Sequence, residues 1–386
     1  ALCYNYGVGT HCRPQAPGGF LFQLESTDEV ILVSDEQWRV RPGADWDWAS
    51  ARMFWTIGFQ EVYDSRRKPV GWNVAGFDDS DWDTPEVIGE AGIEPWTSLV
   101  PRPMPPLREW EESAESVVRC GVCRAVGESE DMDMAVRMCS EERFDSADVI
   151  RHPQRMLDHS KAAAVVLPGQ DVFAVLDFGR EVVGFPSIRV RDGRDAIIDV
   201  GYSEALDDSG HVNPTRQSIL QADRLVLHGG RQEWQSFGRR AFRYMQLAFR
   251  GASEPIHVER VHIDRIGYPV NQVSEFECSD DLLNRIWNVG VYTLSIGMQD
   301  QYEDCPLREH GQYPGDVRVC ALANYYAFFD TMLVRKAIGQ YVQSQQPDGF
   351  FNALWPSSTS HALPDYNLVW VSLLHEYYLY TGDAEL

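Results

Sequence analysis

Long hydrophobic runs are missing from the chain, and cysteine is scarce. No segment reaches the roughly 18 consecutive apolar residues of a membrane-spanning helix, so we expect no membrane partner. Eight cysteines in 386 residues are too few for a disulfide scaffold, which favours a reducing compartment such as the cytoplasm. Cys120 and Cys123 have the spacing of half a zinc knuckle, but no second pair completes four ligands. We therefore expect no metal and no cofactor.

Basic residues are also in deficit. The chain has 34 Lys and Arg against 58 Asp and Glu, a net charge of -24. Nucleic acids and anionic lipids are bound through Lys and Arg that displace counterions, so we expect no nucleic acid partner. A neutral substrate such as a sugar suffers no such repulsion. The 44% of hydrophobic residues supply enough apolar surface for two or three folding units.

The first two units are expected to be antiparallel β-sandwiches, over residues 1–100 and 101–272. Short apolar segments alternate with turns in the first stretch, where tryptophan is concentrated; core packing explains these rings better than a sugar-binding platform. In the second stretch, residues 188–191 are predicted to pair with residues 197–200 in a hairpin. The sequence Asp192-Gly193 between them suits a tight turn.

From residue 273 to residue 386 the pattern predicts helices. Ser279 is the expected N-cap of the first, and Leu282, Ile286 and Val289 lie on one of its faces. Further helices are predicted near residues 316–329, 331–346 and 367–381. Four helices with no strand between them pack on one another. Because the chain ends just after the last helix, we expect a helical domain that is cut short.

The densest chemistry lies in the segment from Asp304 to Asp316, a loop with two prolines and two glycines between predicted helices. It places three carboxyl groups, those of Asp304, Glu309 and Asp316, beside Arg308. Cleaving a glycosidic bond needs one protonated carboxyl group and one carboxylate. Neighbouring negative charge favours the protonated form, so Glu309 is the expected proton donor. An alternative is purely structural: Asp304 lies in the C-terminal turn of a helix, Arg308 and Glu309 form a surface ion pair, and Asp316 caps the next helix.

Two sets of short motifs stand out. The helical part contains Phe276-Glu277-Cys278-Ser279, Asp304-Cys305-Pro306-Leu307-Arg308-Glu309, Gly315-Asp316, Gln346-Pro347-Asp348-Gly349 and Tyr380-Thr381-Gly382-Asp383. The β-rich part contains Tyr63-Asp64, Gly76-Phe77-Asp78-Asp79-Ser80-Asp81-Trp82, Asp177-Phe178-Gly179-Arg180 and Tyr202-Ser203-Glu204. With these motifs the chain resembles the bacterial α-L-rhamnosidases of glycoside hydrolase family 78, in which β-sandwich domains precede an (α/α)6 barrel. The resemblance implies a multidomain β + α protein, two β-sandwiches followed by the first helices of a truncated barrel.

The same resemblance implies the roles of individual residues in removing terminal α-L-rhamnose from a glycoside or oligosaccharide. Glu309 becomes the general acid, although many members place this acid one position later, where this chain has His310. The other implied substrate-binding residues are Asp304, Arg308, Asp316 and Tyr313, with Trp355 and Trp370 as candidate walls of the sugar site. Core packing explains either tryptophan equally well.

The family inverts the anomeric carbon, which implies a general base about 6.5–9.5 Å from the acid. That base is a glutamate later in the barrel, so we expect little hydrolase activity from these 386 residues. We also expect a large apolar helical face that more chain, or a partner such as a second copy in a homo-oligomer, must cover. Two alternatives stay open: another α/α-barrel glycosidase or phosphorylase, and a non-catalytic carbohydrate-binding fragment.

Overall fold

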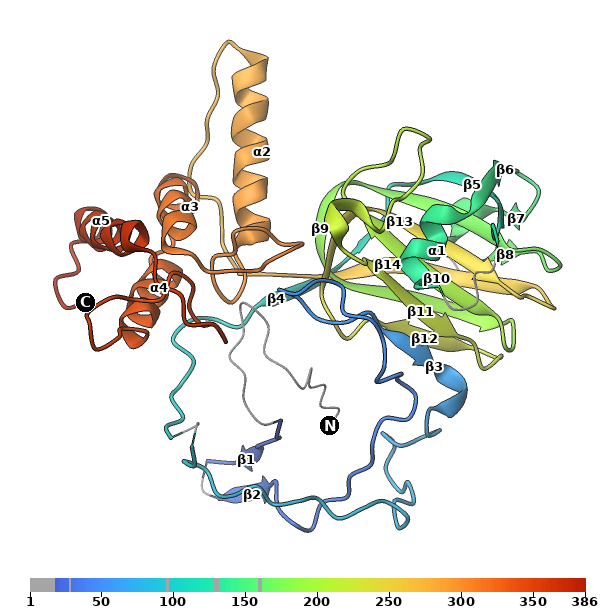
Figure 1. Cartoon of the computed structure of the whole chain (residues 1–386), viewed down its shortest axis with the longest axis horizontal. Coiled ribbons are helices and arrows are strands. Elements are labelled where there is room, and N and C mark those ends of the chain that lie inside the picture. The colour runs from blue at the N-terminus through green and yellow to red at the C-terminus, as the bar shows by residue number, and fades with distance from the viewer. Residues whose placement is uncertain (1–17, 28, 95–96, 128–131, 159–161) are drawn as a thin grey trace.

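The computed structural model describes residues 18–386 apart from 28, 95–96, 128–131 and 159–161, and it contains a large sheet beside a small group of helices (Figure 1). The strands are β1 (Gln23–Glu25), β2 (Val30–Val33), β3 (Val62–Asp64), β4 (Arg108–Ser113), β5 (Ser116–Arg124), β6 (Glu142–Asp145), β7 (Ile150–Arg151), β8 (Ala164–Val166), β9 (Val172–Asp192), β10 (Ile197–Ser203), β11 (Ala222–Val226), β12 (Gln232–Gln235), β13 (Arg240–Arg250) and β14 (Ile256–Gly267). The α-helices are α1 (Met134–Ser140), α2 (Asp281–Gly297), α3 (Pro314–Ala327), α4 (Met332–Gln343) and α5 (Pro364–Thr381).

Strand β9 organises the 12-stranded sheet. Its first half pairs with β5 and β13, and its second half pairs with β12 and β14. Leu176 in the first half and Ile188 in the second belong to one buried apolar cluster, which β10, β13 and β14 also line. Both halves of β9 therefore line the largest buried cluster, and the burial of this apolar surface drives the folding of the sheet.

The predicted hairpin between residues 188–191 and 197–200 is wrong. Both segments are strands, but β10 pairs with β11 and β13, whereas the second half of β9 pairs with β12 and β14. The turn itself is present: Asp192, Gly193 and Asp195 all have positive φ, and a Cβ on Gly193 would lie 2.6 Å from Ile256 Cγ1. An Asp-Gly turn fixes a chain reversal, but it does not decide which strands become hydrogen-bonded neighbours.

The described part of the first hundred residues contains only short strands. β1 and β2 form an antiparallel pair, and β3 joins the large sheet through parallel pairing with β11. Among the tryptophans, Trp46 packs on Tyr63 with ring centroids 4.6 Å apart, whereas Trp48 and Trp55 are exposed. The two separate sandwiches, and the boundaries near residues 100 and 272, stay predictions.

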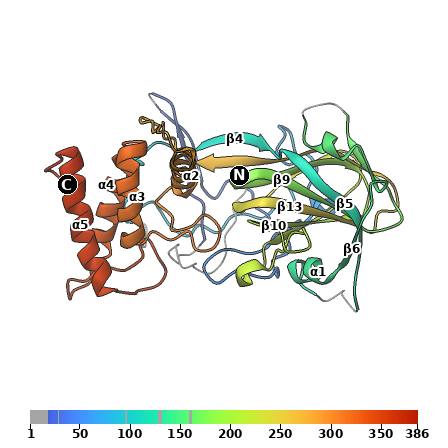
Figure 2. The same ribbon diagram turned by 90° about the horizontal axis from the view of Figure 1, so that it is seen from above.

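The four predicted helices are all present, with boundaries shifted by a few residues. The N-cap of α2 is Asp280 and not Ser279, because the Asp280 side chain accepts a hydrogen bond from the Leu282 backbone at 2.8 Å. Helices α3, α4 and α5 share a buried cluster at the end of the molecule away from the sheet (Figure 2). Helix α2 projects from this group, and its predicted apolar face is exposed: Leu282, Ile286 and Val289 are 57–65% accessible. None of the described helices is long and apolar enough to cross a membrane.

Candidate active site

The segment from Glu303 to Tyr313, named here the acid loop, connects α2 to α3. Asp304 closes the loop: its backbone N–H donates to the Gly311 carbonyl at 2.9 Å, and its Oδ1 accepts from the Gly311 N–H at 2.7 Å. Burial, and then the charge of Glu309, raise the pKa of Asp304 against the opposing hydrogen bond from Gly311. The loop is therefore a fixed support for the side chains between its two ends.

The Glu309 carboxylate lies between two hydrogen-bond donors. Its Oε1 accepts from Arg308 Nη2 at 2.9 Å, and its Oε2 accepts from the Tyr313 hydroxyl at 3.0 Å. The Glu309 side chain is 20% exposed. The Arg308–Glu309 ion pair of the structural alternative is thus present. The two donors fix the orientation of the Glu309 carboxyl group within the loop.

Asp316 lies in the first turn of α3 and completes the group of three carboxyl groups. Burial raises the pKa of Asp316, and the charge of Glu309 raises it further. The alternative that Asp316 is an N-cap is wrong, because Tyr313 holds that position and the helix begins at Pro314. The structure therefore brings Asp304 and Asp316 within electrostatic reach of Glu309, and their roles stay predictions.

Tyr366 is a residue at this site that sequence reasoning missed. Its ring makes an edge-on contact with Tyr313, with centroids 6.3 Å apart, and covers Gly315, where a Cβ would lie 3.0 Å from Tyr366 Cε1. Burial raises the pKa of Tyr366, and so do the charges of Asp316, Asp365 and Asp304. No local signal marks Tyr366, because it reaches the acid loop from α5, a helix much later in the chain.

The two candidate tryptophan walls have different environments. Trp355 is tied to the acid loop through its backbone, whose carbonyl accepts from Gln312 Nε2 at 2.8 Å. Trp370 lies on α5 against Phe351, with ring centroids 4.8 Å apart, and its indole N–H donates to the Ile338 carbonyl at 3.3 Å. Core packing between helices therefore accounts for Trp370, while Trp355 lies beside the acid loop.

The strand-rich unit holds the acid loop from its other side. Thr56 Oγ1 donates to the Arg308 carbonyl at 2.5 Å, and Leu307 packs in a small buried cluster with Ile57 and Val183. These contacts come from the first stretch and from β9. The position of Glu309 therefore depends on both units of the chain.

The cysteine pair considered from the sequence, Cys120 and Cys123, lies on β5. The six cysteines that the structure describes are free thiols, while Cys3 and Cys12 lie outside the described residues. Burial raises the pKa of Cys120 to about 11 and that of Cys123 to about 12. Both thiols are therefore protonated at neutral pH.

Two family models match the chain. Residues 271–386 match the bacterial alpha-L-rhamnosidase 6 hairpin glycosidase domain, and residues 169–264 match the bacterial alpha-L-rhamnosidase concanavalin-like domain. The helical unit with its acid loop is thus similar to the 6 hairpin glycosidase domain. The chain belongs to the bacterial α-L-rhamnosidase family.

Individual relatives agree with this assignment. An alpha-L-rhamnosidase of Formosa agariphila is 26% identical over 238 residues, which are 56% of this chain and 25% of the relative. The GH78 rhamnosidase of Bacillus sp. GL1 has the same fold, with a TM-score of 0.86 at 21% identity over 98% of this chain and 57% of that one. The Streptomyces avermitilis α-L-rhamnosidase complexed with L-rhamnose has a TM-score of 0.62 at 17% identity. The match covers 99% of this chain and 35% of that one. The chain spans a quarter of the curated relative and just over half of the Bacillus structure.

Proposed function

We propose that the chain is part of an α-L-rhamnosidase that removes terminal α-L-rhamnose from a glycoside or oligosaccharide. The reaction inverts the anomeric carbon, and Glu309 is the general acid. The observation that carries the proposal is the position of Glu309. It is half-buried, its charge acts on both Asp304 and Asp316, and Arg308 and Tyr313 hold its two oxygens. The Streptomyces relative is a complex with L-rhamnose, which supports this choice of sugar.

The geometry supports separate roles for the residues of the acid loop. Glu309 gives its proton to the glycosidic oxygen as the bond from that oxygen to the anomeric carbon breaks. Water adds to the opposite face of the carbon and loses a proton to the general base. Asp304, Arg308 and Asp316 bind the ring hydroxyls, with Tyr313 and Trp355 as apolar walls and Tyr366 at the edge. Sugar hydroxyls would replace the Arg308 and Tyr313 contacts to Glu309, leaving its carboxyl group free to take and give a proton.

The finer architecture is part of the proposal. We assign residues 1–100 and 101–272 to two β-sandwiches and residues 273–386 to the first helices of a truncated (α/α)6 barrel. The exposed apolar residues of α2 and α5, among them Ile286 and Leu368, support this assignment, because apolar faces of this kind pack against further helices. The general base is then a glutamate of that later part, outside these 386 residues.

The test compares Glu309→Gln with wild type in a protein that carries the complete barrel. Loss of proton donation should lower kcat on an alkyl α-L-rhamnoside about 10²- to 10⁴-fold. On a dinitrophenyl α-L-rhamnoside, whose aglycone leaves without protonation, the same variant should show a much smaller decrease in kcat. The matched control is Glu277→Gln, which changes an exposed carboxylate before α2 and should leave kcat unchanged on both substrates.

Three results would redirect the proposal. Equal losses on the two substrates would assign Glu309 a structural role. Preference for another glycoside, or a need for inorganic phosphate, would indicate a different α/α-barrel enzyme. Rhamnose binding without any turnover, unaffected by Glu309→Gln, would indicate a carbohydrate-binding protein.

A further inference from the structure

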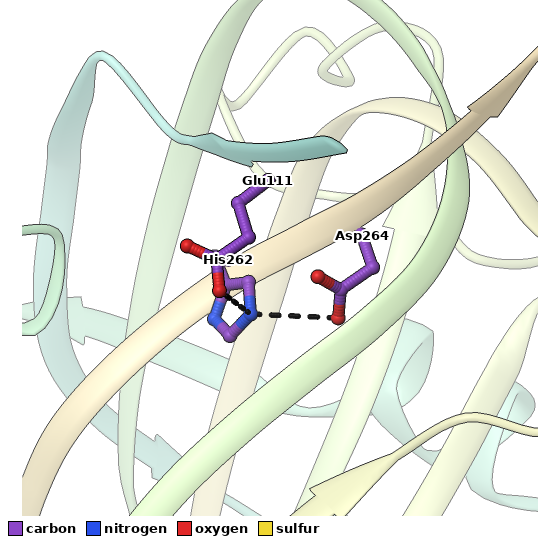
Figure 3. A group of neighbouring side chains, drawn as sticks. All are labelled: Glu111, His262 and Asp264. Atoms are coloured by element: carbon purple, nitrogen blue, oxygen red, sulfur yellow. Dashed lines mark ion pairs between the residues drawn. The ribbon is translucent and has the colours of Figure 1, made fainter. Parts of the chain in front are cut away.

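A group of ligand-type side chains lies on the outer face of the sheet, on strands β14 and β4. His262 and Asp264 alternate along β14 with Val261 and Ile263, which are fully buried in the core, so the first pair faces outward. Strand β4 pairs with β14 in a register that sets Glu111 opposite Asp264. The three side chains converge in Figure 3. This group is separate from the acid loop.

The distances within this group are too long for good hydrogen bonds and suit a shared metal ion. His262 Nε2 lies 3.4 Å from Asp264 Oδ2 and 3.7 Å from Glu111 Oε1, beyond the usual range of about 2.7–3.2 Å. In a tetrahedral site the ligand atoms are about 1.63 times the metal–ligand distance apart. For zinc bound by nitrogen and oxygen this gives about 3.3–3.6 Å. All three ligand atoms lie within 4.8 Å of one another.

The imidazole of His262 is buried and faces both carboxylates through one of its nitrogens. Its side chain is only 3% exposed, and within the part of the chain that the structure describes its Nδ1 has no hydrogen-bond partner. A buried polar ring is stable only when its polar atoms are satisfied. Its Nε2 is directed at the two carboxylates (Figure 3). A cation at that point would bind Nε2 and neutralise the two carboxylates at once, and the ring proton would then lie on Nδ1.

Neighbouring groups orient the two carboxylates. Arg260 Nη2 donates to Glu111 Oε2 at 2.8 Å, which leaves Oε1 directed at His262. Gln235 Nε2 donates to Asp264 Oδ2 at 2.6 Å. Carboxylates that bind metals are commonly held by such hydrogen bonds. Glu111 is half-exposed, so an ion can reach the group from solvent.

We propose that Glu111, His262 and Asp264 form a zinc site, with water completing the coordination. One nitrogen and two carboxylate oxygens suit zinc, whereas calcium takes six to eight oxygen ligands. The ion joins β4 to β14 close to Gly267, where the chain leaves the sheet toward α2. No local sequence pattern marks the site, because only the register of β4 on β14 brings Glu111 to the histidine.

The experiment titrates the 386-residue chain, dialysed against a chelator, with zinc chloride and follows the heat of binding. We expect one tight site per chain. Glu111→Gln and His262→Gln should each weaken it at least about 100-fold. Gln235→Ala, which removes a supporting hydrogen bond but no ligand, should weaken it about 10- to 100-fold. His257→Gln is the matched control, since His257 lies on the same strand and contacts the single carboxylate of Asp192 at 2.8 Å.

Cobalt supplies a second readout that depends on geometry. Co²⁺ in a tetrahedral nitrogen and oxygen site gives visible absorption bands, which the Glu111→Gln variant should lose. If His262→Gln fails to fold, the half-exposed Glu111 still decides the outcome. Absence of a stoichiometric site in the wild type, or unchanged affinity in Glu111→Gln, would overturn the proposal. So would an equal loss in His257→Gln, because weak binding to the acidic surface would then explain the signal.

Discussion

Arg239 Nη2 donates to both carboxylate oxygens of Glu303, at 2.8 and 2.7 Å, and so joins the strand-rich unit to the first residue of the acid loop. Both side chains are largely buried, 15% and 6% exposed. The backbone before Arg239 is itself fixed, because the N–H groups of Phe237 and Gly238 donate to Glu61. Glu303 in turn precedes Asp304. The ion pair therefore sets where the acid loop begins.

Replacing Arg239 with Met should destabilise the chain. It leaves the Glu303 carboxylate buried without its cation, at a cost of about 3–5 kcal/mol in the free energy of unfolding measured with urea. The double variant Arg239→Met, Glu303→Leu should recover much of the loss, because no unpaired charge remains. Arg335→Met is the control, since the Arg335–Asp383 pair is 52% and 24% exposed and should be worth less than about 1 kcal/mol. A loss in Arg239→Met no larger than the control's would contradict this account.

The sequence predicted what depends on local pattern, and it missed what depends on tertiary contact. The helical period indicated all four helices, and prolines and glycines marked the acid loop, so Asp304, Glu309 and Asp316 could be grouped in advance. Tyr366 and Arg239 could not be found, because each reaches the loop from a distant element. The hairpin error has the same origin: an Asp-Gly turn encodes a reversal, while strand partners are chosen by how the whole sheet closes around its core.

Substitutions of Trp355 and Trp370 should have different effects, one on KM and the other on the free energy of unfolding. In a protein with the complete barrel, Trp355→Leu should raise KM for an aryl rhamnoside about 2- to 10-fold, as expected for loss of an aromatic contact worth about 0.5–1.5 kcal/mol. Trp370→Leu should leave KM unchanged and lower the free energy of unfolding by about 2–4 kcal/mol, because it removes packing between α5 and Phe351. A rise in KM with Trp370→Leu alone would reverse the two assignments.

The exposed face of α2 gives a test of the truncated barrel. Ile286 is 57% exposed, so Ile286→Glu in the 386-residue chain should change the free energy of unfolding by no more than about 0.5 kcal/mol and should reduce self-association seen by light scattering. In a protein that carries the complete barrel, the same change should destabilise by a few kcal/mol, because it buries a charge. Ile296, buried at the other end of α2, is the control, and Ile296→Ala should cost about 2–5 kcal/mol in both proteins. If Ile286→Glu were silent in the complete protein as well, no further helix would cover this face.

Stability should depend on pH through Glu181, a carboxyl group on β9 whose backbone carbonyl accepts a hydrogen bond from Tyr292 of α2. Burial, and then the charge of Glu204, raise the pKa of Glu181 from 4.5 to about 7. The folded state therefore holds a proton that the unfolded state releases, so the stabilisation is complete below pH 4.5 and is lost as the pH rises through 7. The full shift corresponds to roughly 3 kcal/mol. Glu181→Gln should flatten the decline in the free energy of unfolding between pH 4.5 and 7 and should stabilise the chain at pH 8. The exposed Glu385→Gln, in the same urea series, should leave the decline unchanged; an equally steep decline in Glu181→Gln would show that another group carries it.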